Sequence, residues 1–91
     1  MPTCFEISGY KIYFWSNENG EEVHVHIAKG KPVENGTKVW LLSDGSTRLE
    51  HNKSRISQHE LNKLLRIIDR NYILVLKEWC AHFNLPPKFK A

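Results

Sequence analysis

The sequence has little cysteine, no long apolar run and no strong excess of charge, and each absence excludes a class of protein. Its 91 residues hold two cysteines, Cys4 and Cys80, which lie far apart and form no Cys-x-x-Cys pair. We therefore expect a cytoplasmic protein with reduced thiols, a disulfide between the two being the alternative. No apolar run approaches the ~20 residues of a membrane helix, and the first residues lack the pattern of a signal peptide.

Charge and motifs set further bounds. The net charge of +3 falls short of the dense basic patch typical of a dedicated nucleic-acid-binding protein. The sequence has no Gly-rich phosphate loop, no nucleophile elbow and no acidic pair at a distinctive spacing. An enzymatic role therefore stays open, with a non-enzymatic one preferred. A chain of this length predicts a single domain over residues 1–91 with one small core.

Alternation and turn signals predict an antiparallel sheet of about four strands, in meander order, within residues 1–50. Turn signals stand at Ser8-Gly9, Asn35-Gly36 and Ser43–Ser46. A hairpin loop is expected at Ser16–Gly20, where Asn19-Gly20 accommodates a positive φ. The expected strand segments are residues 5–7, 10–15, 21–27 and 37–42, with 47–50 as an edge strand.

Residues 57–84 are predicted to form one long C-terminal helix packed on this sheet, which makes the fold class α+β. Ser57 has the place of the N-cap, Glu60 that of its capping-box partner, and the helix ends before Pro86. Ile67 and Leu74 lie on its far side, either as scattered surface residues or as a second seam for a dimer or partner. One face is apolar at helical spacing: Leu61, Leu64, Leu65, Ile68, Tyr72, Val75, Leu76, Trp79 and Phe83.

The segment of residues 21–27 alternates with period two and places His24 and His26 side by side on one face of a strand. The opposite face of the predicted sheet packs under the helix. Its core residues are Val23, Val25, Ile27, Ile12, Phe14, Val39 and Leu41. The histidine face forms a candidate binding surface of His24, His26, Tyr13, Trp15, Trp40, Lys11 and Lys38.

Three interpretations of this binding surface stay open. It could hold zinc or another divalent metal on His24 and His26, although no cofactor is required by the pattern. It could instead stack RNA bases on its aromatic rings, between the lysines. It could also be buried, in a homodimer or against the chain's own tail, because tryptophan is enriched at interfaces. Glu22 lies on the same face as the pair, and the possible distant donors are His51, His59, Cys80 and His82.

Several blocks of the sequence resemble the family named domain of unknown function 4160, which consists of short bacterial proteins. The blocks are Met1–Thr3, Gly9–Phe14, Ser16–Glu18, His24–Ile27 with Lys29-Gly30, and the closing Trp79, Phe83 and Asn84. The resemblance covers nearly the whole chain. Members of the family usually have prolines or another histidine just before the His-x-His pair, where this chain has residues 21–23, Glu-Glu-Val. A site completed by those positions would be altered here.

The resemblance implies no settled activity. It carries over residue by residue at His24 and His26, and at Trp79, which the helix pattern assigns to the core. Members are often encoded beside another small domain, which implies a regulatory or toxin–antitoxin-like pair. We therefore expect an interaction protein with a protein partner, no membrane partner, and the His/aromatic face as its working surface. The alternatives are a metal-dependent or His-based small ribonuclease or hydrolase, and an RNA-binding sheet.

Overall fold

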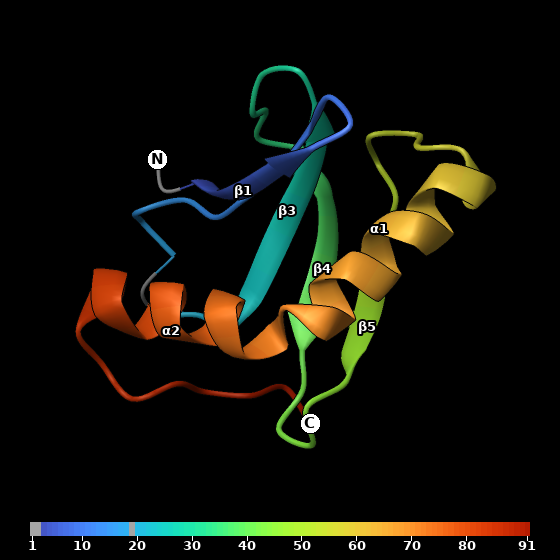
Figure 1. Ribbon diagram of the computed structural model, residues 1–91. Coiled ribbons are helices and arrows are strands. Elements are labelled where there is room, and N and C mark those ends of the chain that lie inside the picture. The colour runs from blue at the N-terminus through green and yellow to red at the C-terminus, as the bar shows by residue number, and fades with distance from the viewer. Residues whose placement is uncertain (1–2, 19) are drawn as a thin grey trace.

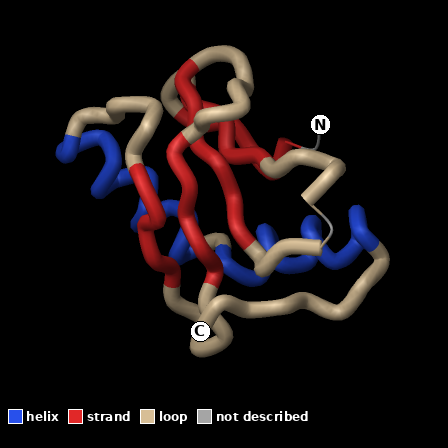
Figure 2. The backbone as a smooth tube through the Cα atoms, turned by 180° about the vertical axis from the view of Figure 1, so that it is seen from behind, coloured by secondary structure: helices blue, strands red, loops and turns tan. Residues whose placement is uncertain are grey.

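The computed structural model describes residues 3–18 and 20–91. They form a five-stranded sheet with two helices on one of its faces, as Figure 1 and the reverse view in Figure 2 show. Each strand pairs antiparallel with the next one in the sequence. The strands are β1 (Thr3–Ile7), β2 (Tyr10–Tyr13), β3 (His24–Lys29), β4 (Thr37–Leu41) and β5 (Thr47–His51), and the helices are α1 (Gln58–Arg70) and α2 (Tyr72–Phe83).

The α+β class and the antiparallel meander are confirmed, whereas the strand count and two strand ends are corrected. The sheet has five strands, because residues 47–51 pair along β4 from Leu41 to Lys38. β2 ends at Tyr13 because the chain then turns, with the Glu18 N–H donating to the Trp15 carbonyl oxygen at 3.2 Å. β3 begins only at His24. The positive φ expected at Asn19 lies outside the described residues.

The prediction of one long helix is wrong, because the helix breaks at Asn71. The Asn71 backbone has φ −107° and ψ 21°, and its side-chain amide donates to the Ile67 carbonyl oxygen at 2.8 Å. Such side-chain bonds to the backbone compete with regular helix geometry. The break turns α2 away from the direction of α1, so that the pair follows the twisted sheet (Figure 1). The predicted cap at Ser57 is confirmed, since its hydroxyl accepts the Glu60 N–H at 3.4 Å.

The core lies between the helices and the sheet and contains the residues that the alternation assigned to it. The seven sheet-side core residues listed above are all fully buried. From the helices they meet Leu61, Leu64, Ile68, Tyr72, Val75 and Trp79. The Phe14 ring packs against Trp79 and Phe83, with centroids 5.0 and 5.4 Å apart. Since burying one such side chain contributes ~1.5–3 kcal/mol, this layer dominates the stability of the fold.

The segment after α2 returns along the end of the sheet to the β4–β5 turn (Figures 1 and 2). The Lys88 carbonyl oxygen accepts the Val23 N–H at 2.8 Å, and the Ala91 carbonyl oxygen accepts the Ser43 N–H at 2.9 Å. The Lys90 ammonium lies 4.8 Å from the centroid of the Trp40 ring. The tail therefore fixes the end of the sheet at which β3 begins. Neither helix in the described part of the chain has both the length and the apolar sequence to cross a membrane.

Candidate metal centre

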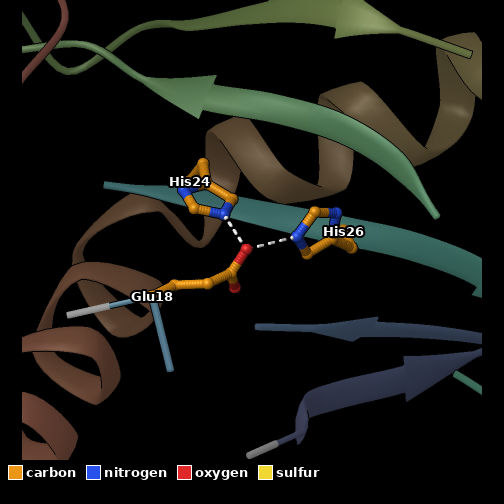
Figure 3. A group of neighbouring side chains, drawn as sticks. All are labelled: Glu18, His24 and His26. Atoms are coloured by element: carbon orange, nitrogen blue, oxygen red, sulfur yellow. Dashed lines mark hydrogen bonds and ion pairs between the residues drawn. The ribbon is translucent and has the colours of Figure 1, made fainter. Parts of the chain in front are cut away.

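Three donor atoms meet where the β2–β3 loop crosses the start of β3. Glu18 Oε2 lies 2.7 Å from His24 Nε2 and 2.9 Å from His26 Nε2, as Figure 3 shows. All three atoms lie within 4.8 Å of one another, and all three residues are buried. The two histidines of the His-x-His motif thus converge on a third side chain from a different segment. We call Glu18, His24 and His26 the triad.

The Trp15–Glu18 turn fixes the Glu18 carboxylate before it meets the histidines. Glu18 Oε1 accepts the Trp15 backbone N–H at 2.6 Å, while the Glu18 N–H bonds back to the Trp15 carbonyl oxygen. A second turn follows, in which the Glu21 N–H donates to the Glu18 carbonyl oxygen at 3.1 Å. One carboxylate oxygen is therefore held by the loop itself, and only the other faces the imidazoles.

The histidines are fixed by the strand register and by their second ring nitrogens. His24 lies opposite Trp40 on β4, and His26 lies opposite Lys38. His24 Nδ1 is 2.8 Å from the Glu22 carbonyl oxygen, and His26 Nδ1 is 3.3 Å from the Gly36 carbonyl oxygen. A carbonyl oxygen only accepts hydrogen bonds, so each Nδ1 carries a hydrogen and donates it. This is the support that metal-ligating histidines commonly have, with Nε2 left for the ion.

The three donor atoms of the triad need added protons or a cation between them, because otherwise no hydrogen lies between them. With Nδ1 protonated, a neutral imidazole presents a lone pair at Nε2, and the Glu18 carboxylate also presents only lone pairs. Three lone pairs would then face one another at distances of 2.7 and 2.9 Å. The contacts become favourable when two protons are added, or when a cation sits among the three atoms.

The electrostatics of Glu18 agree with a positive neighbourhood. Burial raises the pKa of its carboxyl group, but hydrogen bonds from His24, His26 and the Trp15 N–H more than offset this and hold the pKa well below its usual range. Glu18 is consequently an anion in a nearly dry site. A buried anion of this kind needs a compensating positive charge close to it.

The geometry fits a divalent ion after a small adjustment. Zinc bound at ~2.0–2.1 Å to three donors in tetrahedral geometry places the donor atoms about 3.3–3.4 Å apart. The two Glu18–histidine separations of 2.7 and 2.9 Å would widen by about half an ångström, and the two Nε2 atoms, now within 4.8 Å of each other, would take the same spacing. Two imidazoles and one carboxylate form a donor set used by zinc hydrolases and by ferrous enzymes.

A hollow of about 590 Å³ adjoins the triad and is lined by Trp15, Ser16, Asn17, Glu18, Glu21 and Glu34. Glu18 belongs both to this lining and to the triad, whereas neither His24 nor His26 lines the hollow. A metal held by three protein donors keeps a further coordination position for a ligand from outside.

Two other residues of the predicted binding surface contact the triad, since the Tyr13 ring centroid lies 5.5 Å from that of His26 and the Trp40 centroid 5.5 Å from that of His24. Tyr13 and Trp40 are buried, whereas Trp15, Lys11 and Lys38 are half-buried. The Tyr13 hydroxyl donates to the Val33 carbonyl oxygen at 2.7 Å and accepts the Val33 N–H at 3.1 Å. The Trp40 indole N–H donates to Glu50 at 2.6 Å. These two rings are thus covered by the chain's own segments and offer no open face for stacking bases.

The further donors named from the sequence do not join the triad. Glu22 contributes its backbone carbonyl rather than its carboxylate. His82 instead contacts the Ser16 hydroxyl at 3.1 Å, and His51 accepts the Lys53 N–H at 3.3 Å. His59 and Cys80 also lie outside the set of three donors.

Sequence reasoning missed Glu18, which it treated as a loop residue. The available signal was the Ser16–Glu18 block, which is part of the family resemblance and has no role in the core.

A protein-family model with the description Domain of unknown function (DUF4160) matches residues 9–80. The matched stretch contains β2 to β5, α1, most of α2 and all three residues of the triad. Searches among curated proteins and among solved structures each gave no match.

Proposed function

This chain belongs to the DUF4160 family, and from that premise we propose that it is a small metal-dependent hydrolase with one divalent ion held by the triad. The observation that carries the proposal is the convergence of His24 Nε2, His26 Nε2 and Glu18 Oε2 around one point. Both imidazoles are oriented by Nδ1–H bonds to backbone carbonyl oxygens. The proposal thus assigns the His-x-His motif a ligand role together with a third donor.

Each part of the site has a task under this proposal. The ion supplies Lewis-acid chemistry that polarises a substrate carbonyl or similar group. Glu18, His24 and His26 hold it, and the carbonyl oxygens of Glu22 and Gly36 keep the imidazoles in the correct tautomer. The hollow admits substrate. Its carboxylates, Glu21 and Glu34, repel phosphates, so an ester or amide substrate suits the site better than RNA.

Metal binding is tested with a matched pair of glutamate variants. Zinc is titrated calorimetrically into chelator-treated wild-type protein, Glu18→Gln and Glu21→Gln. Glu18 and Glu21 lie in the same loop, and only Glu18 faces the histidines. We expect one zinc per wild-type chain, affinity at least ~10-fold weaker in Glu18→Gln, and no change in Glu21→Gln. Absence of stoichiometric binding, or equal affinity in all three proteins, would overturn the metal site.

Hydrolysis needs its own measurement. Zinc-loaded wild-type protein is assayed on p-nitrophenyl acetate, a carboxylic ester whose product is coloured, and compared with zinc-loaded Glu6→Gln, an exposed residue of β1 outside the hollow, and with Glu18→Gln. Turnover in the first two proteins and its loss in Glu18→Gln is the expected result. If zinc binds with the predicted stoichiometry and carboxylic ester and peptide substrates stay intact, the ion is not hydrolytic and the enzymatic part of the proposal fails.

A second candidate function is that of an interaction protein in a two-component module. The observation that favours it is an apolar pair on the outer side of α2, where Ile73 and Leu74 are 58% and 46% exposed. Of the two far-side residues that could be scattered or form a second seam, Leu74 belongs to this exposed pair and Ile67 lines a hollow beside α1.

The test is co-purification of this chain with the product of the neighbouring gene, whatever its size. Ile73→Lys should abolish complex formation and Glu78→Lys, on the same helix, should not. Complexes that survive Ile73→Lys unchanged would remove this candidate.

A further inference from the structure

A second hollow lies at the end of β3 that is farthest from the triad's first histidine. β3 begins at His24 and ends at Lys29, and Lys29 lines this hollow. Its other walls come from the β1–β2 turn, from residues 54–57 and from the first part of α1. Its volume is about 550 Å³, within the range of ~300–1,000 Å³ for small-ligand sites. No residue of the triad lines it, so its role is separate from that of the metal centre.

The rim of this hollow carries an excess of positive charge. Lys29, Arg55 and Lys63 line it, against one carboxylate, that of Glu60. The ion pairs found among the described residues involve none of these three cations. Arg55 belongs to the stretch between β5 and α1 that also contains Lys53. Uncompensated cations around a concavity focus a positive potential into it and attract anions.

The inner wall of the hollow is apolar. Ile56, Leu64 and Ile67 contribute to it, and both Ile56 and Leu64 belong to the hydrophobic core. The wall is therefore rigid, because these side chains are packed from behind. A hollow with a cationic rim and an apolar wall is complementary to an organic anion, whereas a bare inorganic ion would use only the rim.

We propose that this hollow binds a phosphate monoester whose organic part has about the size of a nucleoside. The phosphate sits among Lys29, Arg55 and Lys63, with the Arg55 guanidinium suited to two parallel hydrogen bonds to phosphate oxygens. The organic part rests on Ile56, Leu64 and Ile67. The site is built from positions that the triad does not use, and the proposal holds whether or not the triad binds zinc.

The test titrates AMP, adenosine and inorganic phosphate into chelator-treated protein at low salt, with backbone amide NMR shifts as the readout. AMP should give saturable shifts at residues around the hollow, inorganic phosphate should bind at least ~5-fold more weakly, and adenosine should not saturate. The Lys29→Gln/Lys63→Gln double variant should weaken AMP binding at least ~10-fold. Lys77→Gln, an exposed lysine on α2, is the matched control and should change the affinity less than ~2-fold.

Several results would overturn the proposal. Equal affinities for adenosine and AMP would show that the three cations do not contribute to binding. Equal affinities for inorganic phosphate and AMP would show that the apolar wall does not contribute. Equal losses of AMP affinity in the double variant and in Lys77→Gln would show that the effect comes from the net charge of the protein and not from this hollow. Absence of saturable AMP shifts in the wild type up to about 10 mM would exclude the site. The same NMR spectra report whether each lysine variant is folded, so a loss of binding is distinguished from unfolding.

Discussion

The replacement of Glu18 by glutamine tests how much the triad contributes to the stability of the metal-free protein. The side chain keeps its shape, and its amide oxygen can still accept the Trp15 N–H that now lies 2.6 Å from Oε1. The negative charge that faces His24 and His26 is lost. In the metal-free protein, the Nε2–H groups that bond to Oε2 would then point at an amide instead of a carboxylate.

The expected loss is large for a single conservative change. A hydrogen bond to a charged group contributes ~1.5–3 kcal/mol, and two such bonds converge on Glu18 Oε2 at 2.7 and 2.9 Å. Rotation of the new amide recovers part of one of them. We therefore expect a loss of about 2–4 kcal/mol, out of the roughly 5–14 kcal/mol typical of a domain of this size. The melting temperature should fall by about 10–25 °C.

Urea denaturation at pH 6 with EDTA measures this loss directly, with the slope of the unfolding free energy checked for constancy between variants. Glu21→Gln serves as the control, since Glu21 makes only a surface ion pair with Lys38 at 3.4 Å and should cost less than ~0.5 kcal/mol. If Glu18→Gln also costs less than ~0.5 kcal/mol, the two histidines do not depend on the carboxylate, and the hydrogen count at the triad is refuted.

Three further predictions concern pH, thiol reactivity and packing. The pKa of Glu18 is held well below its ordinary 4.5, so its contribution to the free energy of unfolding is complete above that value and is lost as pH falls, by at most ~1.4 kcal/mol per pH unit. In urea denaturation at a series of acid pH values, the free energy of unfolding should therefore fall less steeply with pH in Glu18→Gln than in the wild type, and equal slopes would contradict this. Burial, and to a lesser extent the charge of Glu78, raises the pKa of Cys4 to about 12. Iodoacetamide at pH 8.5 should therefore modify Cys4 at least ~100-fold more slowly in the folded chain than in the urea-unfolded chain. Equal modification rates, measured by mass spectrometry, would refute the burial of the thiol. Gly36→Ala should cost about 1–3 kcal/mol in urea, because the new methyl group would overlap a buried tyrosine hydroxyl and lie 3.1 Å from a histidine Cβ, whereas Gly20→Ala, which meets open space, should have little effect.

The sheet and its core were predictable because period-two alternation depends only on which face of a strand is buried. The strand ends were not, because Phe14 and Val23 continue the alternation and are fully buried although neither belongs to a strand. A residue can be buried without being paired in a strand, and the alternating sequence pattern indicates only which residues are buried. The extra residues at both ends of the β2–β3 connection thus form a loop that still packs into the core.

The helix break was invisible for a similar reason. Ile68, Tyr72 and Val75 keep the spacing of one apolar stripe across Asn71, and all three are buried. Periodicity therefore predicts a continuous helix, whereas the break is local to the backbone angles of Asn71 and its side-chain bond to the Ile67 carbonyl oxygen. Asparagine within a helix is a weak signal by itself, because its helix propensity differs little from that of many neighbours.

The spacing of His24 and His26 predicts that they share a face, but it cannot predict the turn that brings Glu18 to them. Glu18 reaches the histidines only because the Trp15–Glu18 turn folds its side chain back toward the sheet. Alternation placed Glu22 on the histidine face and made it the nearer candidate, yet that segment lies before β3 and supplies a carbonyl oxygen. Residues in loops obey no period, so their side-chain directions follow from the hydrogen bonds of the loop.

The triad has one electrostatic requirement that two different occupants can meet. The carbonyl oxygens of Glu22 and Gly36 fix a hydrogen on each Nδ1, so the central atoms need two positive charges, either two protons or one divalent ion. An ion that occupied this point would take the place of those protons. The third donor is positioned in both cases, because one oxygen of Glu18 is held by the Trp15 N–H and not by the occupant. The loop therefore fixes one oxygen of Glu18 independently of what lies among the three donor atoms.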